Sequence, residues 1–393
     1  ASNKEYDRSV SLFEKAAFDG EIVLDKDAAY AAIDIAYKQL NSGVDEDRWF
    51  NKLLDYFEKT NSLYGHDERY KKVSLYLVEK AYEMERYDDV FAIHQKIAST
   101  LSKTDLNRAS YIQALAMIKL ARAEEAEKIL LPLVKDASTR DRSAYRNALG
   151  VAIYEQEKQN FDQGNYVNGI KHAVRLANLL PDLEVASSGL YDAIVAAIDN
   201  QLWPEAATVI ELFQSRFPKH HHSQQVARQL SQVYMNLGNN EKAAFAFESL
   251  SSKDSDATVK RNALWNAAEL YFSQKRYADA MRNYVSYANN NPTPYPQFIE
   301  AAQKIIDISL LNKDVRTANT WRNKIVNKDK QVSSDNKNSR TDTVVSQSAI
   351  ALANDALIRF EAIHLVEPLA KNLAMKKQYM QEALSLYGFA ANY

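Results

Sequence analysis

The chain has 393 residues, and its 49 lysines and arginines nearly balance 51 aspartates and glutamates, which leaves a formal charge of −2. This balance excludes a global field that would draw the chain to nucleic acid or anionic lipid. No run reaches the roughly 18 apolar residues of a membrane-spanning helix, and the lack of cysteine excludes disulfides, thiolate metal sites and cysteine nucleophiles.

The composition favours long helices over a fold of short strands and tight turns. Only nine glycines and eight prolines occur, while alanine, leucine and lysine, which lose little rotamer freedom in a helix, are abundant and are supplemented by glutamate and glutamine. The 23 tyrosines suit helix seams that are apolar at one end and wet at the other. We therefore predict an all-α chain.

The first 60 residues predict an antiparallel pair of helices over residues 28–40 and 47–59. Their apolar positions do not follow the pattern seen further along the chain. Because the terminal units of repeat arrays have one face in water and are commonly atypical, we predict an N-terminal helical cap over residues 1–60.

From residue 61 to 326 the apolar residues recur as helix pairs. In the clearest pair, Leu264, Ala267 and Tyr271 lie on one stripe of a first helix, and Ala280 and Tyr284 begin a second. The residues at the turns between paired helices give a ruler. They are Tyr87, Ala123, Tyr166, Trp203, Asn240, Tyr277 and Val315, at successive distances of 36, 43, 37, 37, 37 and 38 residues. The longest step predicts an extended first helix over residues 143–163.

The order of a small residue, an aromatic four residues later and a closing proline, as in Ala280, Tyr284 and Pro292, resembles the tetratricopeptide repeat family. The resemblance covers roughly residues 70–326, with a period near 37 instead of the family's usual 34. It implies a right-handed superhelical solenoid of antiparallel helix pairs, each covering the apolar flank of the next. HEAT-like and Sel1-like helical pairs are the alternatives.

The C-terminal part departs from the repeat. Residues 327–342 are polar and predict a surface loop. Residues 343–393 predict two long helices, over 343–365 and 368–387, as a non-repeat helical end. The second carries a stripe of apolar residues, which is either a cap that folds back on the last repeat or a docking element for a partner. The stripe consists of Leu369, Leu373, Met380, Leu384 and Tyr387.

No motif indicates an enzyme. Phosphate loops, dinucleotide fingerprints, zinc-protease motifs and nucleophile elbows are all missing from the sequence. The histidine run His220 to His222 lacks an acid at ligand spacing, so we expect no metal there. Acidic clusters such as Asp45 to Asp47 fall where carboxylates cap helices. We expect neither catalytic residues nor a cofactor.

In the family that the chain resembles, the first helices of successive repeats line a concave groove that grips peptides. Carried onto this sequence, the residues beside the core stripe become the predicted partner-binding set, although ordinary packing is the alternative for its aromatics. These are Tyr111, Tyr191, Arg228, Gln232, Asn236, Trp265, Glu269 and Phe272. Only Arg228 approaches the basic clamp with which some members hold a C-terminal carboxylate.

The sequence therefore predicts a non-enzymatic protein–protein interaction scaffold, with other proteins or peptides as partners, no nucleic acid and no membrane insertion of this segment. A cysteine-free chain that starts at Ala1 suggests a periplasmic or otherwise exported protein of a bacterial cell-envelope complex, with the cytoplasm as the alternative location. The rival function is a regulatory module that senses a peptide or ligand and signals through its terminal helices.

Overall fold

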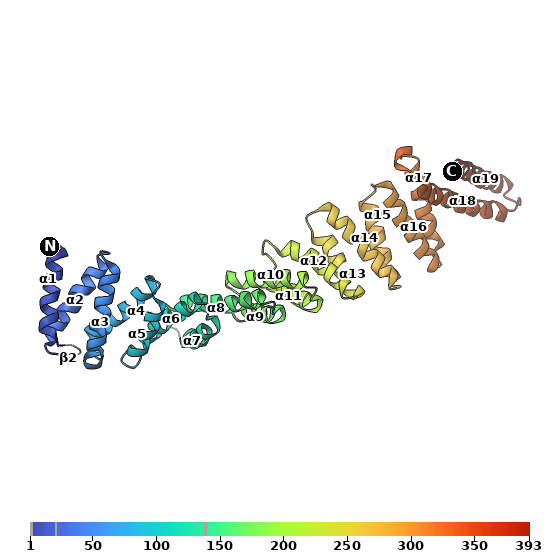
Figure 1. Ribbon diagram of the computed structural model, residues 1–393. Coiled ribbons are helices and arrows are strands. Elements are labelled where there is room, and N and C mark those ends of the chain that lie inside the picture. Colours follow the sequence, from blue (N-terminus) through green and yellow to red (C-terminus); the bar gives the residue numbers. More distant parts are fainter. Residues whose placement is uncertain (1–2, 20–21, 137–139) are drawn as a thin grey trace. The chain divides into compact units, whose positions relative to one another are not determined.

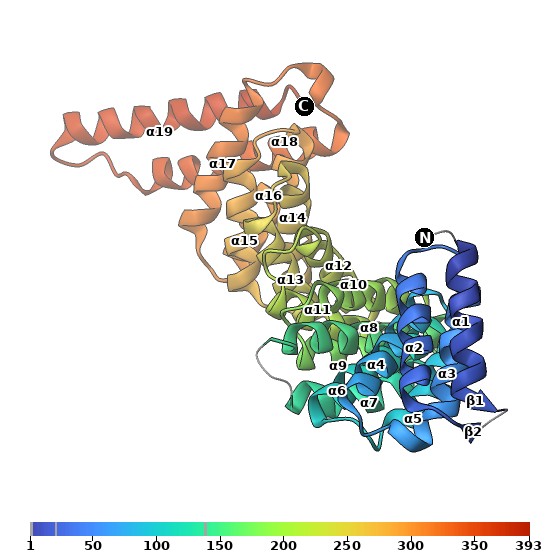
Figure 2. The ribbon, with the colours of Figure 1, turned by 90° about the vertical axis from the view of Figure 1, so that its left-hand side faces the viewer.

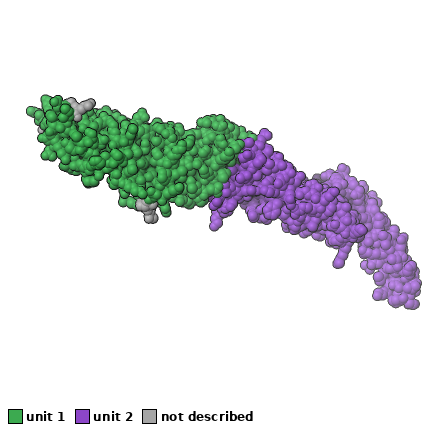
Figure 3. Space-filling view, turned by 90° about the horizontal axis from the view of Figure 1, so that it is seen from below, with its two compact units in different colours: residues 1–200 green, residues 201–393 purple. Residues whose placement is uncertain are grey.

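The computed structural model describes residues 3–19, 22–136 and 140–393. Within them lie 19 α-helices, one short 3₁₀-helix and a two-stranded hairpin, which confirms the all-α prediction (Figure 1). The hairpin was not predicted and pairs β1 (Phe18–Asp19) with β2 (Ile22–Val23). The chain divides into two compact units, residues 1–200 and 201–393 (Figure 3).

Unit 1 begins with α1 (Asn3–Ala17), which precedes the predicted pair α2 (Lys26–Asn41) and α3 (Glu46–Tyr64). Asp25 caps α2 by accepting hydrogen bonds from the backbone amides of Asp27 and Ala28. The predicted cap boundary at residue 60 falls inside α3. The remaining helices of the unit are α4 (Glu68–Glu83), α5 (Tyr87–Ile97), α6 (Lys103–Lys119), α7 (Ala123–Asp136), α8 (Arg142–Asp162), α9 (Tyr166–Leu179) and α10 (Glu184–Asp199).

Helix α8 is the extended first helix expected over residues 143–163, and at 21 residues it is the longest helix of unit 1. Unit 2 continues the series of helix pairs. Its helices are α11 (Trp203–Arg216), α12 (Ser223–Asn236), α13 (Asn240–Lys253), α14 (Ala257–Ser273), α15 (Tyr277–Asn290), α16 (Tyr295–Leu311), α17 (Val315–Asp329), α18 (Ser339–Ala362) and α19 (Leu369–Ala390).

The turn residues used as a ruler are a structural feature of the chain, because each is the first residue of a helix, from Tyr87 of α5 to Val315 of α17. Two residues before each of them the backbone turns left-handed. The residues with positive φ are Glu85, Ala121, Gly164, Gln201, Gly238, Lys275 and Lys313. After Lys275, for example, the backbone amide of Arg276 donates a hydrogen bond of 2.9 Å to the carbonyl of Tyr271, as in a Schellman motif. The period of about 37 residues is therefore confirmed, while the handedness of the superhelix stays a prediction.

Small residues form the seams of the core, as the sequence indicated. Ala267 and Ala268 on α14 and Ala280 on α15 are fully buried, and they let these helices approach closely. Tyrosines complete the seams with a buried ring and a bonded hydroxyl. Tyr284 donates to Glu269 and Tyr295 donates to Asp329, each at 2.6 Å. This is the amphipathic use of tyrosine that the composition suggested.

The predicted loop over residues 327–342 is wrong at both ends. Helix α17 continues to Asp329, and α18 already begins at Ser339, so that the connection spans residues 330–338 and includes a 3₁₀ turn over Ser334–Asn336. Two local interactions explain the extra helix. Buried Asp329 accepts a bond from Lys337 at 2.8 Å, and Asn338 forms a capping box with Thr341.

The two long C-terminal helices are present as α18 and α19. Their bounds differ by up to four residues from those predicted. They pack against each other, and α18 also contacts α16 and α17. In Figure 2 this hairpin projects beyond the pair α16–α17.

Candidate binding groove

Arg228, the one basic residue of the predicted binding set, forms an ion pair with a buried carboxylate of the fold. Its guanidinium donates two hydrogen bonds, of 2.7 and 2.8 Å, to the carboxylate of Asp254. The Asp254 side chain is fully buried, whereas that of Arg228 is 41% exposed. The hydrogen bonds from Arg228 lower the pKa of Asp254 to about 2.

The predicted residues on α14 are similarly engaged. Trp265 packs edge-on against the rings of Tyr284 and Tyr287, with centroids 5.7 and 5.2 Å away. Glu269 accepts the hydrogen bond from the Tyr284 hydroxyl. Phe272 packs against the core of unit 2 and lies under the ammonium of a lysine on α16. The alternative of ordinary packing describes these side chains well.

The other predicted residues lie on separate helices. In unit 1, the ring of Tyr111 of α6 packs at a tilt of 46° against that of Tyr145, with centroids 4.9 Å apart, and Tyr191 of α10 is half-buried. In unit 2, Gln232 and Asn236 are exposed on α12. Although Gln232 and Asn236 lie 3.4 Å apart, the structure gathers no cavity around the eight residues as a set. Their role in binding stays a prediction.

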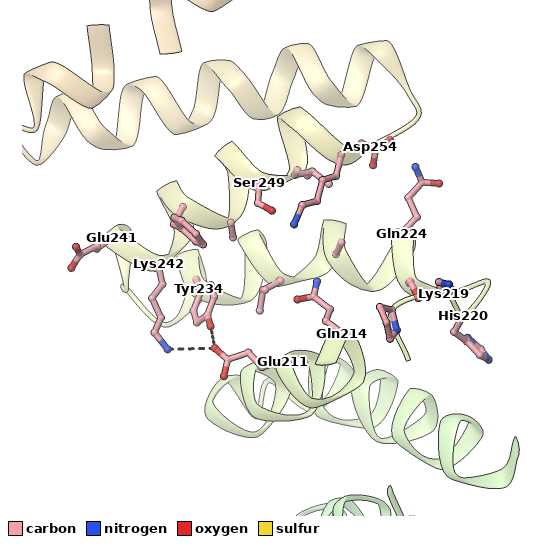
Figure 4. A pocket seen from close by; sticks show the side chains of 18 of the residues that line it. Glu211, Gln214, Lys219, His220, Gln224, Tyr234, Glu241, Lys242, Ser249 and Asp254 are labelled. Carbon is pink, nitrogen blue, oxygen red and sulfur yellow. Dashed lines mark hydrogen bonds and ion pairs between the residues drawn. The ribbon is translucent and has the colours of Figure 1, made fainter. Parts of the chain in front are cut away.

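A cavity lies instead within unit 2, between α11 and α13, with α12 as its floor (Figure 4). We call it the α11–α13 groove, and its volume is about 1270 Å³. Pro218, His220 and His221 close one end, and Tyr271 and Arg276 line the other side. Its remaining lining is Glu211, Gln214, Lys219, Ser223, Gln224, Ala227, Leu230, Tyr234, Glu241, Lys242, Phe245, Ala246, Ser249, Leu250, Lys253 and Asp254.

One polar cluster links the three helices of the groove. Tyr234 of α12 donates a short hydrogen bond to Glu211 of α11, and Lys242 of α13 lies 3.4 Å from the same carboxylate (Figure 4). The Lys242 ammonium also sits 5.1 Å from the centre of the Tyr234 ring. Burial and the acceptor carboxylate both raise the pKa of the Tyr234 hydroxyl. The cluster is thus a neutral, bonded tie across the groove.

The rest of the groove offers apolar surface and positive charge. Phe245 of α13 is 70% exposed, more than any other large hydrophobic residue of the described chain, and it lines the groove together with Ala227 and Leu230 of the floor. Lys219 and Lys253 also line it. Among the described residues neither of these two lysines forms an ion pair closer than 4.0 Å. The groove can therefore take an apolar side chain and an anionic group together.

Sequence reasoning missed the groove because it considered only the surface of the first helix of each pair, as the resemblance to the family implied. The walls of the groove come from α11 and α13, which are the second helices of two successive pairs, and only its floor comes from a first helix, α12. A signal was present at Phe245. It stands between the buried alanines Ala244 and Ala246 but off the stripe of Ala243 and Leu250, so a large aromatic there has no core to enter. The sequence does not show that α11 lies across the groove from Phe245, because that depends on how the helices are packed.

A smaller cavity of about 510 Å³ occupies the corresponding place in unit 1, between α7 and α9 over α8. Its lining is polar, and its charges are mutually bonded. Arg175 donates two hydrogen bonds, of 2.7 and 2.9 Å, to Glu127, and it also contacts His172 at 3.0 Å. This cavity has no exposed aromatic, which distinguishes it from the α11–α13 groove.

No family model matches the chain, and no curated protein matches it. Several solved structures do. The tetratricopeptide domain of P58(IPK) is 14% identical over 90% of this chain and 99% of its own, with a TM-score of 0.25. A tetratricopeptide repeat protein from Parabacteroides merdae is 9% identical over 72% of this chain and 100% of its own, with a TM-score of 0.30. The quorum sensor NprR from B. thuringiensis is 14% identical over 80% of this chain and 98% of its own, with a TM-score of 0.25.

The described residues include no helix with the length and apolar character required to cross a bilayer. They also contain no group of three or more histidines, cysteines or acids arranged to hold a metal ion. The rings of His220 and His221 contact each other at a tilt of 34°, with centroids 4.1 Å apart, and His220 meets Phe213 edge-on at 5.3 Å.

Proposed function

We propose that this chain is a non-enzymatic interaction scaffold that binds a peptide segment of a partner protein in the α11–α13 groove. The observation that carries the proposal is Phe245, an aromatic ring 70% exposed at the edge of an open cavity. Exposing such a ring is unfavourable in the free chain, and covering it releases that cost. Aromatic anchors in pockets are the residues that most often carry binding energy in protein interfaces.

The charge of the groove suggests what accompanies the apolar anchor. Glu211, Glu241 and Asp254 are each bonded to a basic side chain, at 3.4, 3.1 and 2.7 Å respectively. Lys219 and Lys253 are exposed cations at the same groove. We propose that a bound segment presents an apolar side chain to Phe245 and an acidic residue to these lysines. Such a contact would weaken as salt is added.

Panning a random peptide library on the full chain tests this proposal, with the selected peptides then titrated by fluorescence anisotropy. Phe245→Ala should weaken their binding by about tenfold, which corresponds to roughly 1.4 kcal/mol. Leu179→Ala is the control, because Leu179 is 46% exposed, belongs to unit 1 and does not line the groove. If no peptide is selected, or if the selected peptides bind Phe245→Ala as tightly as the parent, the groove is not the site.

A second proposal concerns the location of the protein and the complex in which it acts. We propose an exported protein that assembles a bacterial cell-envelope complex, for which the support is a cysteine-free composition. Fractionation of the source cells would test it, because recovery in the cytoplasmic fraction would contradict export.

A further inference from the structure

The outward side of α19 carries a stripe of large apolar side chains in contact with water. Leu369, Leu373, Met380 and Leu384 are 47, 40, 42 and 64% exposed. At about 100° per residue these four positions fall within a sector of roughly 60° on the helix. They belong to the stripe that the sequence offered either as a cap on the last repeat or as a docking element.

The contacts of α19 leave most of the stripe uncovered. Ala383 and Ala390 are the buried residues of the helix, and Ala390 packs in a cluster with Val326 of α17 and Leu352 of α18. Tyr387, the fifth residue of the predicted stripe, donates a hydrogen bond of 2.5 Å to Asn354 of α18. At about 100° per residue Tyr387, Ala383 and Ala390 fall at or beside one edge of the stripe's sector, while the four apolar residues themselves stay 40 to 64% exposed.

The exposed surface extends over the tip of the hairpin. Ile358 near the end of α18, and Leu365 and Val366 in the connection, are 65, 53 and 60% exposed. Together with the four stripe residues they expose on the order of 600 Å² of apolar surface, near the roughly 800 Å² that each partner of a standard interface buries. An apolar surface of this size on one hairpin marks an interface.

The spacing of the stripe points to the partner. Counting from Leu369, its residues are separated by 4, 7 and 4 positions, so the stripe reads the same from either end. An antiparallel copy of α19 would therefore place Leu369 opposite Leu384 of the second copy, and Leu373 opposite its Met380. Such a self-complementary match is the signature of a two-fold, isologous contact.

Charge agrees with a second copy better than with a charged partner. Residues 355–384 contain four acids and four bases, so the hairpin has no net field. At the centre of the stripe, Lys376 is held within its own chain, where its ammonium donates to the carbonyl of Ile363 at 3.1 Å and lies 4.5 Å from the Phe360 ring. Only Lys377 is left to face its counterpart across the axis, a mild repulsion that salt would screen.

We propose that this protein forms a two-fold dimer through antiparallel packing of α19 against α19 of a second copy. The dimer joins two chains at their C-terminal hairpins and leaves both α11–α13 grooves as they are in the single chain. It is independent of what the grooves bind. Because the contact is small, the dimer should be weak, with a dissociation constant on the order of tens of micromolar.

Sedimentation equilibrium of the full chain from about 1 to 300 µM tests the dimer. The mean mass should rise toward twice that of the monomer, and added salt should not weaken the association. Leu384→Glu places a charge in the stripe twice per dimer and should hold the chain at monomer mass. Leu311→Glu is the control, since Leu311 at the end of α16 is 59% exposed. Both variants should keep the circular dichroism of the parent. A parent chain that stays monomeric, or a Leu384→Glu chain that dimerises like the control, overturns the proposal.

The absence of native cysteine allows a sharper test of the geometry. In the antiparallel dimer, position 377 lies beside its own counterpart, whereas the two copies of position 384 are about 22 Å apart along the helices. A disulfide requires Cα atoms within roughly 7 Å. Mild oxidation should thus cross-link Lys377→Cys and leave Leu384→Cys monomeric. Equal cross-linking of both, as in a parallel pair, or none at position 377, contradicts the two-fold arrangement.

Discussion

Removing the guanidinium of Arg228 should destabilise unit 2, because it leaves the buried carboxylate of Asp254 without its cation. The Asp254 side chain is fully buried and its pKa is lowered to about 2 by the hydrogen bonds from Arg228. Relative to the ordinary value of 3.8, that shift corresponds to about 2 kcal/mol of stability at neutral pH. We therefore expect Arg228→Ala to lower the free energy of unfolding by about 2 kcal/mol, in line with the cost of unpairing a buried charge.

The pH dependence gives this prediction its signature. A carboxyl group whose pKa is depressed on folding contributes its stability above the pKa of the unfolded chain and loses it as the pH falls through the folded value. The difference between parent and Arg228→Ala should be complete at pH 7 and shrink by roughly half at pH 3. Urea unfolding followed by circular dichroism at several pH values measures both quantities. A loss of packing alone would give a difference that does not change with pH.

Arg340→Ala is the matched control in the same unit. Arg340 also donates two hydrogen bonds, of 2.7 and 3.2 Å, to a carboxylate distant in sequence, but its partner Glu300 is 34% exposed. Solvent screens such a pair, so the control should cost no more than about 0.5 kcal/mol. If Arg228→Ala lowers the free energy of unfolding no more than Arg340→Ala does, the ion pair of Arg228 with Asp254 does not stabilise the fold. A role of Arg228 in binding a partner would then be the better explanation for this residue.

Two further substitutions test the turns and the core. Gly238→Ala should lower the free energy of unfolding by about 1 kcal/mol, because the backbone φ at Gly238 is +68°. Gly388→Ala should raise the free energy of unfolding by about a few tenths of a kcal/mol, because Gly388 lies on helix α19 with open space around its Cα. Thermal unfolding of both variants measures the two effects. Glu157 is fully buried and burial, with Asp192 nearby, raises its pKa to about 9. Stability should therefore fall as the pH rises from about 5 to 9, and Glu157→Gln should flatten that fall in the midpoint of thermal unfolding.

The periodic part of the structure could be predicted from the sequence because it is written in residues that repeat. Small residues such as Ala267 and Ala280 fix the seams, and the turn residues from Tyr87 to Val315 begin helices as the ruler implied. The left-handed turns are harder to see. Only two of the seven in the ruler carry glycine, while Ala121 or Lys275 adopts positive φ without any local signal. Tertiary packing of the flanking helices imposes the turn at those positions.

The groove that we propose as the binding surface could not be predicted, because it depends on side chains that depart from the repeat. The pair of Tyr234 and Glu211 recurs 37 residues later as Tyr271 and Glu248, which are bonded at 2.8 Å. These two pairs tie α12 to α11 and α14 to α13, so they serve the packing of the array.

The position of Phe245 behaves differently, and this difference explains why the groove opens where it does. Thirty-seven residues later stands Arg282, whose guanidinium donates to Glu248 at 2.8 Å and so bridges α15 to α13. In the preceding pair, phenylalanine cannot make that bond to Glu211, which is contacted instead by Lys242 at 3.4 Å, and the Phe245 ring remains exposed in the groove. A repeat array keeps its shape with the residues that recur and gains a binding site where one of them is replaced. The periodicity of a single sequence reveals the residues that recur, but it does not reveal a position at which the recurring residue is replaced.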